Sequence, residues 1–86
     1  MAIVLITGCS SGFGLGAAVA LARRGETVVA SMRNVSRAGK LRDAAGDTML
    51  DIVQLDVTDA KSREAAVSEV VTKHGRIDVL INNAGH

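Results

Sequence analysis

The most informative segment of the chain is Thr7-Gly8-Cys9-Ser10-Ser11-Gly12-Phe13-Gly14. It follows an apolar run, residues 3–6, and leads into an Ala- and Leu-rich segment that begins at Leu15. This order predicts a strand, a glycine turn and a helix. Such a turn directs free backbone N–H groups, and the positive end of the helix dipole, to a point where a phosphate can bind. Glycines suit it because tight turns need positive φ angles, and because side chains would keep a pyrophosphate away from the backbone.

The glycines can be read in two registers. Residues 12–17 match the ordinary dinucleotide pattern G-x-G-x-x-A. Residues 7–14 can instead be read as T-G-x-x-x-G-x-G, with Gly8 at the end of the strand. The hydroxyls of Ser10 and Ser11 can hydrogen-bond a phosphate or merely cap the helix. Phe13 is either a wall of the phosphate site or a plug in the core.

The rest of the chain continues the alternation of strands and helices. We expect strands at residues 2–7, 27–31, 49–55 and 79–82, and helices at residues 12–24, 37–45 and 60–74. The strands are short, apolar and rich in β-branched residues, which is typical of strands buried on both faces. We expect Ser36 and Thr58 to cap the second and third helices, and Gly46 and Gly75 to end them. The buried stripe of the third helix is expected to be Val67, Val70 and Val71.

This alternation predicts an α/β fold with a parallel sheet and right-handed crossovers. In the dinucleotide-binding order the four strands are arranged 3-2-1-4, with the first two helices on one face and the third on the other. Ligands of such sheets bind beyond the carboxyl ends of the strands, where the order reverses. The glycine turn follows strand one, and Asn83-Ala84-Gly85 follows strand four, so both should flank one crevice. Strand four, residues 79–81, would form a bare apolar edge.

Composition excludes several classes of protein. The chain has 86 residues, a net charge of +1 and 48% hydrophobic residues, which indicates at most one domain and no disorder. The small net charge does not indicate binding to nucleic acid or to a membrane surface. No apolar run reaches the length of about 20 residues that a membrane-spanning helix needs. The N-terminus does not resemble a secretory signal. The single cysteine, Cys9, is expected to be a neutral filler in a cytoplasmic protein, and no residues have the spacing of metal ligands.

The second glycine register resembles the short-chain dehydrogenase/reductase family. Two further motifs support the resemblance, which covers all 86 residues: Asn82-Asn83-Ala84-Gly85 looks like the family's N-N-A-G segment, and Leu55-Asp56-Val57 lies where the family has an adenine-contacting Asp. The resemblance implies a Rossmann-like doubly wound sheet, here partial, and a dinucleotide cofactor. The implied cofactor-binding residues are Gly8, Ser10, Ser11, Gly12, Phe13, Gly14, Arg33, Asp56, Val57, Asn83, Ala84 and Gly85. Asp56 could instead only cap its turn, and Asn82 and Asn83 could only tie loops together.

Arg33 bears on the choice of coenzyme. NAD sites of this fold usually have an acid at the end of strand two, which hydrogen-bonds the ribose hydroxyls. Here no acid occurs between Glu26 and Asp43, and Arg33 lies at that strand end. A guanidinium suits a 2′-phosphate because it can form bidentate, charge-assisted hydrogen bonds. The alternative is that Arg33 is an ordinary solvated arginine. On the absence of the acid and the presence of Arg33, we favour NADP(H) over NAD(H).

The family's activity is hydride transfer between nicotinamide and an alcohol or carbonyl carbon. Its catalytic Ser and Tyr-x-x-x-Lys lie beyond the matched part, and the chain contains no Tyr, so no catalytic residue is assigned. We therefore expect residues 1–86 to be a single cofactor-binding segment without the catalytic half. The alternatives are a non-catalytic dinucleotide-binding or regulatory module and a truncated gene product. The expected partners are the dinucleotide and, at the edge of strand four, either the remaining polypeptide or a second copy.

Overall fold

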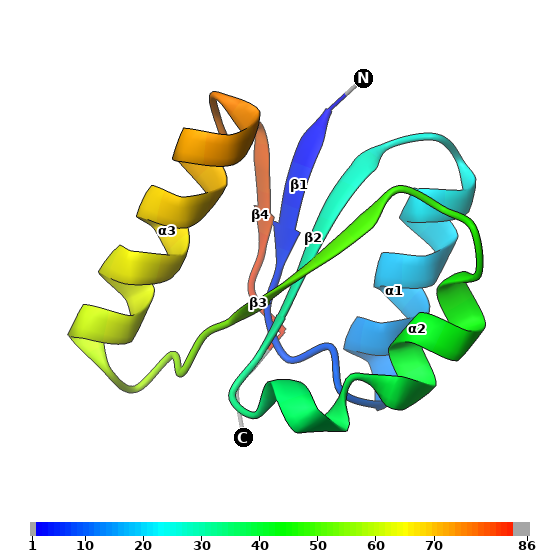
Figure 1. Cartoon of the computed structure of the whole chain (residues 1–86), viewed down its shortest axis with the longest axis horizontal. Helices are drawn as coiled ribbons and strands as arrows, with labels where there is room; N and C mark the ends of the chain where they lie inside the picture. The colour runs from blue at the N-terminus through cyan, green and yellow to red at the C-terminus, as the bar shows by residue number, and fades with distance from the viewer. Residues whose placement is uncertain (1, 84–86) are drawn as a thin grey trace.

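The computed structural model describes residues 2–83, which form a four-stranded parallel sheet with helices on both faces (Figure 1). The strand order is β3-β2-β1-β4, as predicted. In chain order the elements are β1 (Ile3–Ile6), α1 (Gly12–Arg23), β2 (Thr27–Met32), a 3-10 helix η1 (Val35–Arg37), α2 (Gly39–Ala45), β3 (Leu50–Gln54), α3 (Ala60–His74) and β4 (Val79–Ile81). Each strand begins and ends within one residue of its expected bounds, which is the ordinary uncertainty of element ends.

The two central strands are β1 and β2, and every residue of both is buried. Leu5 of β1 pairs with Val29 of β2 on one side and with Leu80 of β4 on the other. Because successive side chains of a strand point to opposite faces, each central strand contributes to two cores. This explains why β1 and most of β2 are apolar in the sequence.

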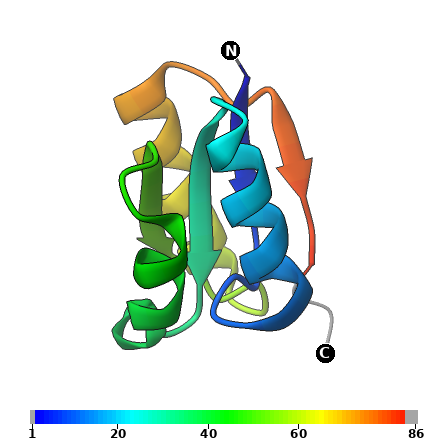
Figure 2. The same cartoon turned by 90° about the vertical axis from the view of Figure 1, so that its right-hand side faces the viewer.

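The two cores lie on opposite faces of the sheet. Helices α1 and α2 cover one face and α3 covers the other, as predicted (Figures 1 and 2). The core under α1 and α2 consists of small and aliphatic side chains, among them Val4, Ile6, Val28, Ala30, Met32, Ala18, Ala22 and Leu41. The core under α3 consists of Ile3, Leu5, Val29, Val53, Leu55, Ala66 and Val70. The aliphatic composition of the sequence therefore suffices for both layers.

The predicted N-cap residues of α2 and α3 are wrong, although the predicted ends are right. Ser36 lies inside η1 and not before α2. The backbone N and the Oγ of Ser36 donate hydrogen bonds of 3.0 and 2.7 Å to the Oδ1 atom of Asn34. For α3, the cap is Asp59 and not Thr58. The N-cap residue of α2 is Ala38, whose side chain makes no capping hydrogen bond, whereas at α3 Asp59 is a stronger cap residue than its neighbour Thr58 and takes the role. Helix α2 is followed by Gly46 at φ 58° and α3 by Gly75 at φ 89°.

The buried stripe of α3 is narrower than predicted. Ala66 and Val70 are buried, whereas Val67 and Val71 are 44% and 42% exposed. The small Ala66 and Val70 make the contact with the sheet, and within residues 2–83 no second helix lies beside α3 to cover the outer valines. The apolar edge strand is as expected, since Leu80 of β4 is 61% exposed.

Candidate functional site

The glycine turn between β1 and α1 has the conformation that its glycines permit. Gly8 and Gly12 have φ angles of 69° and 63°, a region that L side chains rarely adopt. Ser11 is the N-cap residue of α1, but its side chain makes no capping hydrogen bond. Within residues 2–83 the hydroxyls of Ser10 and Ser11 have no hydrogen-bond partner, so the helix-capping alternative is not supported. The first N–H groups of an α-helix have no partner within the helix and can bind an anion.

Gly14 has a packing role that the sequence alone did not reveal. A Cβ atom at this position would lie 2.2 Å from the carbonyl oxygen of Gly8 and 2.6 Å from the Nδ2 atom of Asn83. Gly14 is buried and does not line the cavity described below. The absence of a side chain lets α1 approach the turn closely, and a role of Gly14 in coenzyme binding stays a prediction.

Hydrogen bonds join the carboxyl ends of β1 and β4. The Thr7 backbone N donates to the Ile81 carbonyl at 3.0 Å, and the Thr7 hydroxyl accepts from the backbone N of Asn83 at 2.8 Å and donates to Oδ1 of Asn82 at 3.1 Å. The Asn83 side chain donates to the Gly8 carbonyl at 3.3 Å. The asparagines therefore tie the loops together. Contact of Asn83 with a cofactor stays a prediction, and Ala84 and Gly85 lie outside the described residues.

Cys9 is a buried, neutral part of the turn, as predicted. Its backbone N donates to the Ser31 carbonyl at 3.0 Å, and its thiol donates to the Ile6 carbonyl at 3.3 Å. Burial raises the pKa of Cys9 to about 11, so the thiol stays protonated at neutral pH. The thiolate is the nucleophilic form of cysteine, and the site therefore offers no reactive sulfur.

Asp56 follows β3 and caps its own turn. Its Oδ1 atom accepts hydrogen bonds from the hydroxyl and the backbone N of Thr58 at 2.7 and 3.0 Å. These hydrogen bonds, with a smaller contribution from the charge of Arg33, hold the pKa of Asp56 below its usual 3.8. The carboxylate is therefore ionised at neutral pH. Its other oxygen has no hydrogen-bond donor among residues 2–83, so it can accept one from a ligand; adenine contact stays a prediction.

Four segments from far apart in the sequence line one cavity of about 610 Å³ at the carboxyl ends of the strands. The lining residues are Gly8, Ser10, Ser11, Gly12, Phe13, Met32, Arg33, Leu55, Asp56, Val57, Thr58 and Asn83. Nine of these are predicted site residues, and the three that sequence reasoning missed, Met32, Leu55 and Thr58, directly adjoin predicted ones. Phe13 is 76% exposed, so its interpretation as a core plug is wrong.

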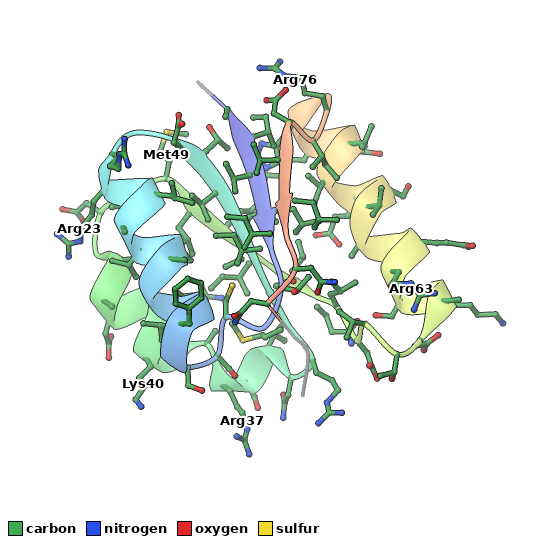
Figure 3. The ribbon with its side chains drawn as sticks, turned by 180° about the vertical axis from the view of Figure 1, so that it is seen from behind. Arg23, Arg37, Lys40, Met49, Arg63 and Arg76 are labelled. Atoms are coloured by element: carbon green, nitrogen blue, oxygen red, sulfur yellow. The ribbon has the colours of Figure 1, made fainter. Side chains whose placement is uncertain are left out.

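A second cavity of about 410 Å³ adjoins the first. Its lining consists of Ser10, Ser11, Arg37, Gly39 and Lys40, so the two serines belong to both cavities. Figure 3 shows Arg37 and Lys40 at the lower end of the molecule, far from Met49 and Arg76 at its upper end. Sequence reasoning missed Arg37 and Lys40, because basic residues near a helix start resemble any solvated surface.

Residues 2–83 lack two other kinds of feature. They contain no cluster of three or more His, Cys, Asp or Glu side chains arranged to hold a metal ion. They also contain no helix with the length and apolarity needed to span a bilayer.

Comparison with known proteins identifies the family. The family model described as short chain dehydrogenase matches residues 2–86. The human 17-beta-hydroxysteroid dehydrogenase type 1 is 47% identical over 91 residues, an alignment that covers 96% of this chain and 27% of that protein. The chain thus spans only about a quarter of that curated relative.

Solved structures share the fold. A metagenomic short-chain oxidoreductase in complex with NADP superimposes with a TM-score of 0.90 at 31% identity, covering 99% of this chain and 39% of the other. A 3-ketoacyl-(acyl-carrier-protein) reductase from Brucella melitensis complexed with NADH gives a TM-score of 0.86 at 37% identity, covering 98% and 34%. Structural relatives thus bind either nicotinamide dinucleotide. The fold, the glycine turn and the matched family model agree, and the chain belongs to the short-chain dehydrogenase family.

Proposed function

We propose that these residues form the NADP(H)-binding segment of a short-chain oxidoreductase. In the whole protein the activity would be hydride transfer between nicotinamide and an alcohol or carbonyl carbon. One observation carries the proposal. The glycine turn, Arg33, Asp56 and Asn83 come from four different loops, and all line a single cavity at the carboxyl ends of the strands. Doubly wound sheets bind dinucleotides at this place.

Each part of the cavity suits one part of the coenzyme. The turn offers the free hydroxyls of Ser10 and Ser11 and the N-terminal end of α1 to the pyrophosphate. The unengaged carboxylate oxygen of Asp56 would accept a hydrogen bond from the adenine amino group, beside Val57. Asn83, already fixed by Thr7 and Gly8, would line the ribose. Phe13 would close one wall of the cavity with its exposed ring.

The preference for NADP(H) rests on the charges at the end of β2. The residues there are Met32, Arg33 and Asn34, and no carboxylate stands in the place where an NAD site has one. Arg33 is exposed and lines the cavity, so its guanidinium is free to reach a 2′-phosphate. The acid that lines the cavity, Asp56, follows β3 instead.

We propose that catalysis needs residues outside this segment and that the edge strand β4 is covered by another strand. The chain contains no Tyr, and we propose that the catalytic Ser and Tyr-x-x-x-Lys lie outside these residues. Val79 and Leu80 of the edge strand are 43% and 61% exposed. An apolar edge of this kind invites pairing, either with the remaining polypeptide or with a second copy of the chain.

The test is a pair of titrations by isothermal calorimetry, with NADPH and with NADH. Replacing Arg33 by Ala should weaken NADPH binding by about 1–3 kcal/mol, the scale of hydrogen bonds to a charged group, and leave NADH binding nearly unchanged. Arg24→Ala is the matched control, since Arg24 is an exposed arginine that lines neither cavity. Equal losses for both coenzymes would contradict the role of Arg33. A native protein that binds neither coenzyme would contradict the proposed function.

A further inference from the structure

Two side chains outside the larger cavity connect two of the loops that line it. The hydroxyl of Ser62, in the first turn of α3, accepts a hydrogen bond of 2.8 Å from the backbone N of Asp56. The same hydroxyl donates to the Oε1 atom of Gln54 at 3.3 Å. The Nε2 atom of Gln54 donates in turn to the Arg33 carbonyl at 3.3 Å. These three hydrogen bonds, the Ser62–Gln54 bridge, run without a break from the loop after β3 to the loop after β2.

The bridge begins where the backbone pairing of β2 with β3 ends. The backbone N of Leu55 donates to the Met32 carbonyl at 2.9 Å, and within residues 2–83 no backbone hydrogen bond joins the two loops beyond this pair. Arg33 and Asp56, the next residues of the two loops, both line the larger cavity. Side chains therefore set the separation of the loops at the place where they face a ligand.

The bridging side chains have no other evident task. Capping of α3 is performed by Asp59, whose carboxylate accepts a hydrogen bond from the backbone N of Lys61 at 3.0 Å, so Ser62 is not needed as a cap. Gln54 is exposed and adds nothing to either core, and neither Gln54 nor Ser62 lines a cavity. A loop that is already ordered avoids the entropy loss that a mobile loop suffers when a ligand binds. The bridge can therefore act on binding without touching the ligand.

We infer that Ser62 and Gln54 are positioning residues that hold the loops after β2 and β3 at a fixed separation around the adenosine half of the coenzyme. This inference rests on the proposed function and extends it, since that function places Arg33 and Asp56 at the adenosine half. The bridge consists of uncharged groups and fixes backbone atoms. It therefore raises the affinity for NADPH and NADH alike and does not set the preference between them.

The experiment breaks the bridge at each side chain in the full natural polypeptide. Ser62→Ala, Gln54→Met and the double variant are titrated by isothermal calorimetry with NADPH, with NADH and with ADP, the part that both coenzymes share. Each single variant should bind all three ligands about threefold to tenfold more weakly, the range for one hydrogen bond. The double variant should lose little more than the weaker single variant, because both side chains belong to one chain of hydrogen bonds. The ratio of NADPH to NADH affinity should not change.

Two matched variants serve as controls. Ser62→Thr keeps a hydroxyl and should bind the ligands like the native protein. Ser68→Ala removes an exposed serine of the same helix that lines neither cavity, and it should have no effect. The losses should be the same at low salt and in about 1 M salt, because no charge is removed. Gln54→Met should keep the native midpoint of urea unfolding, since Gln54 is exposed, so its loss of affinity cannot come from unfolding.

The outcomes separate this inference from the proposed function. If the native protein binds the coenzymes but Ser62→Ala and Gln54→Met bind them equally well, the inference is overturned and the proposed function stands. Fully additive losses in the double variant would overturn it too, since the two side chains would then act independently. A loss in Ser62→Ala that Ser62→Thr does not restore would show that packing, not the hydroxyl, is responsible. Binding of neither coenzyme by the native protein would defeat both proposals.

Discussion

Replacing Gly14 by Ala should destabilise the protein much more than the same replacement two residues later at Gly16. A Cβ at position 14 would lie 2.2 Å from the Gly8 carbonyl oxygen, whereas ordinary contacts begin at 3.4 Å. The helix and the turn must therefore separate by about 1.2 Å. A Cβ at position 16 would have no atom within 4 Å. Both glycines lie in α1, so the change in helix propensity is similar at the two positions.

The expected magnitude follows from two contributions. Forcing an extra carbon into a packed contact costs about 1–3 kcal/mol. Separation also strains the 3.3 Å hydrogen bond from the Asn83 side chain to the Gly8 carbonyl, and such a bond contributes about 0.5–1.5 kcal/mol. The difference between the two variants should therefore be roughly 2–4 kcal/mol in the free energy of unfolding. A domain of this size has only about 4–13 kcal/mol in total, so the effect is large.

The assay is equilibrium urea unfolding, followed by circular dichroism, of the native protein and both variants. Gly16→Ala should be neutral or stabilising by up to about 1 kcal/mol, because Ala is the better helix former. Gly14→Ala should unfold at a clearly lower urea concentration. Equal midpoints for the two variants would refute the reasoning, since they would show that α1 does not approach the turn closely.

The other predictions concern acidity and the edge of the sheet. Partial burial by itself raises the pKa of Asp51, but hydrogen bonds from Lys73 and His74 outweigh it and hold that pKa below 3.8. A lowered carboxyl pKa stabilises the fold above the unfolded value, and the stabilisation is lost as the pH falls through the folded pKa. Asp51→Asn should thus lower the free energy of unfolding by under about 1 kcal/mol at pH 7 and leave it nearly unchanged near pH 2. Urea titrations at the two pH values measure this, and a loss that does not depend on pH would contradict the prediction. For the 86-residue chain, Leu80→Lys should reduce self-association measured by sedimentation velocity. Met49→Lys should not, although Met49 is an apolar residue of comparable exposure beside the opposite edge strand. Equal effects of the two substitutions would contradict pairing through β4.

The fold could be predicted from the sequence because few topologies are available to it. Short buried strands that alternate with helices indicate a parallel sheet with right-handed crossovers, and the dinucleotide-binding arrangement then predicts the observed strand order 3-2-1-4. The cap residues could not be predicted as well. Asn34 and Asp59 accept hydrogen bonds from backbone N–H groups, and their near neighbours Ser36 and Thr58 are residue types that can do the same. The width of the buried stripe of α3 depends on which elements pack beside the helix, and the sequence of the helix does not reveal those neighbours.

Part of the candidate site could likewise be predicted from the sequence, and part could not. Its motifs lie at strand ends, so the cavity lined by Gly12, Arg33 and Asp56 could be expected from topology. The packing role of Gly14 could not, because it depends on how closely the Gly8 carbonyl approaches α1, and on Asn83, which is close only after β4 has paired with β1. The second cavity depends on the course of the chain through η1, a 3-10 turn that no sequence pattern indicated.

The exposed ring of Phe13 makes the chain unusually easy to observe by NMR. These 86 residues contain one Phe and neither Trp nor Tyr, so a single benzene ring gives all the phenyl resonances. That ring lies 76% exposed on the wall of the larger cavity. A purine or pyridine base that stacked near it would shift its proton signals through the ring current of the ligand, without isotope labelling or assignment. Phe13, which lies outside the core, is therefore a natural spectroscopic probe of whether a ligand occupies the larger cavity.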